Sequence, residues 1–95
     1  MHLPTIHRIR LDEAGTALEG TRTPTGFSVV IPDRKAMENG KLIEKRDDRV
    51  VKVETKNTAQ GAKITFTFRK SVPPYKVRLK QDFVEFFISA PEKAK

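Results

Sequence analysis

The chain has 95 residues, which is enough for one domain with its own core and too few for two. It contains no cysteine, so disulfides and thiolate chemistry are excluded. Its formal net charge of +7 favours polyanions as partners, namely nucleic acid, anionic lipid or an acidic cell-wall polymer, although lysine can also simply keep a small β-domain soluble.

No apolar run approaches the roughly 18 residues that cross a bilayer, and no transmembrane segment is expected. Residues 1–11 include Pro4 and several charges where a signal peptide has an apolar stretch, so no signal peptide is expected either. We therefore expect a cytoplasmic protein, or a mature or excised piece of a larger one.

Residues 5–32 predict two strands separated by a long polar segment. The first strand has two faces, which are His7, Ile9 and Leu11 on one side and Ile6, Arg8 and Arg10 on the other. Residues 12–26 are rich in Gly, Thr and Pro and predict a long loop with room for a short edge strand near Leu18. Residues 27–31 are apolar and β-branched, which predicts a buried strand that ends at Pro32.

Residues 33–40 have two interpretations. Asp33 could cap a short helical turn that ends at Asn39-Gly40, with Gly40 in the positive-φ conformation of a helix C-cap. The alternative is a tight hairpin at Asn39-Gly40. We favour the helical turn because Lys, Ala, Met and Glu are good helix formers. No regular element is predicted for the charged residues 41–48.

Residues 49–89 organise the chain, because four stretches there alternate apolar and polar side chains for at least part of their length. The stretches are 49–56, 62–69, 75–80 and 83–89, and turn formers separate them at 57–61, 71–74 and 81–82. Short connections force antiparallel neighbours, so the second half predicts a four-stranded antiparallel meander.

The last of these strands is apolar on both faces, with Phe83 and Phe87 on one and Val84, Phe86 and Ile88 on the other. Such a strand lies between two layers or in the centre of a sheet. The meander needs a second layer, which the first half of the chain must supply. We therefore predict an all-β fold, a small two-layer β-sandwich. It forms a single domain over residues 1–95, with a folded core at about 5–91 and a charged tail at 92–95.

Four stretches carry a resemblance to a known family. They are Arg49-Val-Val-Lys-Val, Gly61-Ala-Lys-Ile-Thr-Phe-Thr-Phe, Pro74-Tyr-Lys-Val and Phe83-Val-Glu-Phe-Phe-Ile. In this pattern of strands and turns the chain resembles the AMIN domain over residues 5–91. The resemblance implies a β-sandwich that is a non-catalytic accessory module of bacterial cell-envelope proteins, such as peptidoglycan amidases and pilus secretins. It further implies periplasmic localisation as part of a larger exported protein, and binding to peptidoglycan.

Residue types for catalysis or metal binding are sparse. His2 and His7 are the only histidines, and their odd spacing points them to opposite faces of a strand. Ser28, Ser71 and Ser89 have no histidine base near them in the sequence, and no Gly-rich phosphate-binding motif opens a helix. We therefore predict that the protein is not an enzyme and holds no metal or cofactor.

A binding surface is predicted on the polar faces of the C-terminal strands. Its candidate residues are Lys52, Lys63, Arg69, Lys76, Arg78 and Lys80. Under hairpin pairing they would form one basic patch, with Thr65 and Thr67 between them. Cations and hydroxyls on a flat sheet suit a carbohydrate polymer that bears carboxylates. The alternative is a solvated sheet face without a ligand.

Three functions remain open at this point. They are a peptidoglycan-binding envelope module, a nucleic-acid-binding β-domain, and a protein-interaction domain that binds by strand addition. Binders of single-stranded nucleic acid expose aromatic rings among their cations. Phe66, Phe68 and Tyr75 fall on the face opposite the lysines, which favours a core role, so the exposure of the phenylalanines separates the second function from the other two.

Overall fold

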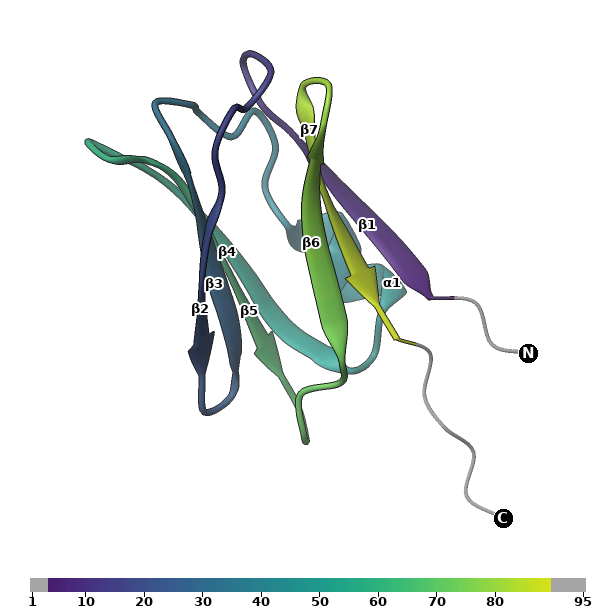
Figure 1. Ribbon diagram of the computed structural model, residues 1–95. Coiled ribbons are helices and arrows are strands. Elements are labelled where there is room, and N and C mark those ends of the chain that lie inside the picture. Colours follow the sequence, from purple (N-terminus) through teal and green to yellow (C-terminus); the bar gives the residue numbers. More distant parts are fainter. Residues whose placement is uncertain (1–3, 90–95) are drawn as a thin grey trace.

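The computed structural model describes residues 4–89, which form seven strands and one short helix (Figure 1). The strands are β1 (Thr5–Arg10), β2 (Glu19–Thr23), β3 (Gly26–Pro32), β4 (Val50–Thr58), β5 (Gly61–Phe68), β6 (Tyr75–Lys80) and β7 (Phe83–Ile88), and the helix is α1 (Lys41–Arg46). The predicted tail at 92–95 and His2 lie outside the described residues.

Two antiparallel sheets form the two layers of the fold. One sheet has the strand order β1-β7-β6, and the other has the order β2-β3-β5-β4. The sheets lie face to face, with the three-stranded sheet on the right of Figure 1 and the four-stranded sheet on the left. The predicted all-β sandwich is therefore confirmed, and so is the presence of a four-stranded antiparallel sheet.

The membership of that four-stranded sheet differs from the predicted meander. Strands β4 and β5 pair as a hairpin, and so do β6 and β7, but the chain changes sheets between β5 and β6. The connection, residues 69–74, contains Pro73 and Pro74, which have no N–H group to donate to a β-ladder. At roughly 3.3 Å per residue it is also long enough to cross the about 10 Å between packed sheets. The place beside β7 is taken by β1.

Residues 33–40 form neither the predicted helical turn nor a hairpin. They run as an extended connection beside the end of β1, where the Met37 amide donates to the Arg10 carbonyl over 2.8 Å. Gly40 has a φ of −92° and precedes α1, so it is not a positive-φ C-cap. Glycine is needed there for a different reason, because a Cβ atom would overlap the side chain of Val53 on β4.

The predicted edge strand near Leu18 is present as β2, which pairs with β3. The predicted buried strand is β3, with Phe27, Val29 and Ile31 inside the core. The structure also has a helix, α1, in a segment for which no element was predicted, and α1 packs against β4 through the buried Ile43.

Aromatic side chains from both sheets fill the core. The ring of Phe66 lies 4.8 Å from that of Phe27 and 4.7 Å from that of Phe86, centroid to centroid, and Tyr75 stacks on Phe27 at 4.0 Å. Phe27, Phe66 and Phe86 are fully buried. Each such side chain contributes roughly 1.5–3 kcal/mol through burial, so this cluster holds the two sheets together.

Candidate binding site on the three-stranded sheet

The outer face of the three-stranded sheet carries two phenylalanines on β7, with basic side chains on β1 at one side and on β6 at the other. Its cross-strand rows are Ile6–Phe87–Lys76, Arg8–Glu85–Arg78 and Arg10–Phe83–Lys80. Strands β1 and β6 both alternate, so their basic residues point away from the core and flank β7 on either side. We call these nine residues the cationic face.

Glu85 lies at the centre of the cationic face and is bonded from both sides. Arg8 donates from Nε to Oε2 over 2.6 Å, and Arg78 donates from Nε to Oε1 over 2.8 Å. The Glu85 side chain is only 2% exposed although it points outward, because the two arginine side chains cover it. The hydrogen bond from Arg8, followed by that from Arg78, holds the pKa of Glu85 below its ordinary value, so Glu85 is ionised at neutral pH.

The remaining charges leave the cationic face positive. Arg10 donates from Nε to Asp82 Oδ2 over 3.1 Å at an exposed position. Lys76 and Lys80 are exposed and form no ion pair with another residue between positions 4 and 89. Phe83 and Phe87 are half-buried, so part of each ring is open to solvent between the cations.

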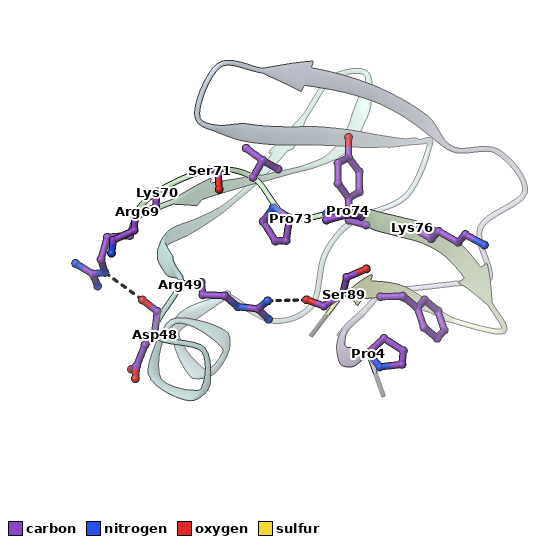
Figure 2. Close-up of a pocket in the computed structure, with 13 residues that line it drawn as sticks. Pro4, Asp48, Arg49, Arg69, Lys70, Ser71, Pro73, Pro74, Lys76 and Ser89 are labelled. Atoms are coloured by element: carbon purple, nitrogen blue, oxygen red, sulfur yellow. Dashed lines mark hydrogen bonds between the residues drawn. The ribbon is translucent and has the colours of Figure 1, made fainter. Parts of the chain in front are cut away.

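A broad open cleft of about 1420 Å³ continues from the cationic face (Figure 2). It lies where the chain changes sheets, and the wall formed by Pro73, Pro74 and Tyr75 is apolar. Lys76 and Phe87 belong to both the cleft and the cationic face, so the two surfaces are continuous.

Basic residues also line this cleft, and some of them are held by hydrogen bonds. Arg49 donates from Nη1 to the Ser89 carbonyl over 2.6 Å, and Arg69 donates from Nε to the Asp48 carbonyl over 3.1 Å. Figure 2 shows both contacts as dashed lines, with the Arg69–Asp48 contact at the left of the view. The cleft therefore extends the positive surface beyond the edge of the sheet.

The six predicted binding residues do not form one patch. Lys76, Arg78 and Lys80 lie together on the cationic face, and Arg69 lines the cleft at its end. Lys52 and Lys63 lie on the outer face of the four-stranded sheet, on the opposite side of the molecule. The predicted patch is wrong in this respect because β5 and β6 belong to different layers.

The outer face of the four-stranded sheet is less charged and rich in hydroxyls. Lys52 is paired in register with Thr67, and Thr65 lies in the next outward row, where its Oγ1 is 2.7 Å from Ser28 Oγ. Lys56 is 3.6 Å from Glu54 on the same strand. The hydroxyls between the predicted cations are therefore on this sheet and not on the cationic face.

Sequence reasoning did not include six residues of the cationic face among the candidates, namely Ile6, Arg8, Arg10, Phe83, Glu85 and Phe87. The signals were present in the alternation of β1 and in the two apolar faces of β7. What the sequence did not supply was the pairing of β1 with β7, which joins the first and last strands of the chain.

A buried polar cluster lies between the sheets at the start of β4. Arg49 donates from Nε and Nη2 to the two carboxylate oxygens of Asp47, each over 2.9 Å, and His7 Nε2 is 3.4 Å from Asp47 Oδ2. Burial lowers the pKa of His7 despite the opposing effect of Asp47, so His7 is neutral at pH 7. Burial alone would raise the pKa of Asp47, but the hydrogen bonds from Arg49 hold it below its ordinary value.

Comparisons with known proteins return no match to a family model, to a curated protein or to a solved structure. In the part of the chain that the structure describes, no helix is long and apolar enough to cross a membrane. The same residues contain no group of three or more potential metal-ligating side chains.

Proposed function

We propose that this protein is a non-catalytic binding module that attaches a larger exported protein to peptidoglycan in the periplasm. The observation that carries the proposal is the arrangement of the cationic face, where basic side chains on β1 and β6 flank the rings of Phe83 and Phe87 on β7. The resemblance to the AMIN domain supports the choice of ligand and compartment.

The chemistry of the cationic face suits this polymer. Peptidoglycan presents carboxylates on its peptide stems, and cations bind carboxylates through charge-assisted hydrogen bonds. Its sugar rings have apolar faces that can lie against an aromatic ring, which offers a large flat apolar surface. A sheet face that continues into an open cleft accommodates an extended chain better than a compact small molecule, which binds in an enclosed pocket.

Single-stranded nucleic acid is the second candidate ligand. Its support is the position of Phe83 and Phe87, which are half-buried among cations, as stacking platforms are in single-strand binders. Phe66 and Phe68 are buried, as expected for core residues, so only the rings on β7 favour this ligand. The AMIN resemblance gives it no support, and we rank it second for that reason.

Co-sedimentation with purified peptidoglycan sacculi, beside a mobility shift with single-stranded DNA at the same salt concentration, tests the proposal. We expect the protein to sediment with sacculi and to leave the DNA unshifted. Binding to DNA alone would overturn the envelope function in favour of the second candidate. Because both ligands are polyanions, salt dependence by itself does not separate them.

A further inference from the structure

The outward side of the Arg8–Glu85–Arg78 row is a specific site within the cationic face. We propose that Arg8 and Arg78 together bind one carboxylate of the polymer through their Nη groups, while Glu85 holds both arginines in position. The inference rests on the proposed function and names the chemical group that the centre of the face recognises.

The hydrogen bonds of the two arginines leave their outer donors available. Each arginine uses Nε for Glu85, and no bond from an Nη group of either one is present among residues 4–89. The side chains of Arg8 and Arg78 are 54% and 58% exposed, so these donors face solvent. A guanidinium has five N–H donors in a planar fork that matches the two oxygens of a carboxylate.

Glu85 makes the two arginines a pre-organised pair. They come from strands that do not pair with each other, and β7 lies between them. The shared carboxylate fixes each guanidinium at its Nε, so less side-chain freedom is lost when an anion binds. Two cations and one carboxylate leave a net charge of +1, which a single bound carboxylate neutralises.

The neighbours of Glu85 on β7 indicate a ligand and not only an internal ion pair. An arginine–glutamate–arginine row across three strands would stabilise the sheet without any aromatic neighbours. Phe83 and Phe87 nevertheless occupy the next outward positions on either side of Glu85, and no sheet or helix formed by residues 4–89 covers them. At about 6.8 Å for two residues of strand, ring, anion site and ring follow one another along β7. This order fits a polymer in which flat apolar units alternate with acidic groups.

The test compares two substitutions that both conserve charge. Arg8→Lys/Arg78→Lys removes the forks and keeps the net charge, since lysine is a point charge. Lys52→Arg/Lys63→Arg is the control, which also conserves charge but lies on the outer face of the four-stranded sheet, away from the cationic face. In co-sedimentation with sacculi we expect the first variant to bind about tenfold more weakly than wild type, and the control to stay within about threefold.

Sacculi whose carboxylates have been converted to amides provide the second arm. Wild type should bind these sacculi about tenfold more weakly than it binds native sacculi. On the amidated sacculi, Arg8→Lys/Arg78→Lys should bind only slightly more weakly than wild type, because the carboxylates that Arg8 and Arg78 would bind are absent. Glu85→Gln, monitored for folding by thermal unfolding, should reduce the preference for native over amidated sacculi. Single Arg8→Lys replaces the double variant if the latter does not fold.

The outcomes separate the two claims. If wild type binds native sacculi and the two charge-conserving variants bind equally, the carboxylate subsite is overturned and the proposed function stands. If wild type does not bind sacculi at all, both are overturned. If the arginine variant loses binding to single-stranded DNA and not to sacculi, the site recognises phosphate, and the carboxylate assignment is wrong.

Discussion

Arg78 lies against the ring of Phe87, with its guanidinium carbon 4.9 Å from the ring centroid. The same side chain bonds Glu85, so it joins the charged centre of the cationic face to one of its two aromatic rings. A cation at this distance from a ring is attracted to its π-face, which holds the arginine in place.

Replacing Phe87 tests the aromatic part of this face. We expect Phe87→Leu to weaken sacculus binding about three- to tenfold, because leucine keeps most of the apolar volume and loses the flat ring and the contact with Arg78. The free energy of unfolding should change by less than about 1.5 kcal/mol. Phe87→Tyr, which keeps the ring, is the control and should bind like wild type. Equal loss of binding in both variants would show that the aromatic ring at position 87 does not contribute to sacculus binding.

Phe66→Ala tests the core. Phe66 is fully buried and stacked between Phe27 and Phe86, so we expect a loss of about 3–5 kcal/mol in the free energy of unfolding, measured by urea denaturation. Phe83→Ala is the matched control on the outer face, where the ring is only half-buried, and it should lose clearly less. A similar loss at both positions would mean that the cationic face is itself covered in solution.

Gly40→Ala tests the contact between the start of α1 and β4. A Cβ at this position would overlap Val53, so the substitution should destabilise the fold by about 1–3 kcal/mol through overpacking. Gly20→Ala is the control on the edge strand β2, because the nearest atom to its added Cβ is 3.9 Å away. We expect the control to change the free energy of unfolding by less than about 0.5 kcal/mol. Equal tolerance at both sites would contradict the close approach at Gly40.

His7 makes stability depend on pH. Burial lowers its pKa below 6.5, and Arg49 and Arg46 add to this effect while Asp47 opposes it. Below pH 6.5 the unfolded chain therefore binds a proton that the folded protein does not, and the free energy of unfolding decreases until the pH reaches the folded pKa. Urea midpoints at pH 7.5 and 5.5 measure this decrease.

The control for this prediction is His7→Gln, in which the difference between the two pH values should shrink. Asp47 does not contribute to this difference between pH 7.5 and 5.5. Because its pKa is lowered in the folded protein, its stabilising contribution is lost only as the pH falls below about 3.8. An identical pH dependence in wild type and His7→Gln would show that His7 is not the titrating group.

Period-two alternation was enough to predict most of the strands and their inward faces. It placed Phe66 in the core and Arg8 on an outward face, because both follow from local geometry alone. The pairing of strands was harder to predict. A short connection normally joins neighbours in one sheet, and only the Pro73-Pro74 pair indicated that the chain would leave the sheet there.

The candidate site was predicted in part for the same reason. Lys76, Arg78 and Lys80 are adjacent on one strand, so their common face follows from the sequence. The opposing row from β1 depends on the pairing of Arg8 with Glu85, which are 77 positions apart. No local sequence pattern encodes a contact over this separation. Without the pairing of β1 with β7, Glu85 would have an arginine on one side only, namely Arg78 on β6.

The most direct measurement of the central claim compares the two outer faces of the sandwich in one sacculus co-sedimentation experiment. Lys76→Glu/Lys80→Glu reverses two charges on the cationic face that form no ion pair within residues 4–89, and Lys52→Glu/Lys63→Glu makes the same change in net charge on the four-stranded sheet. We predict that the first variant loses at least about tenfold in binding while the second stays within about threefold of wild type. Equal loss in both, with both variants folded, would contradict a defined binding face and reduce the interaction to net charge.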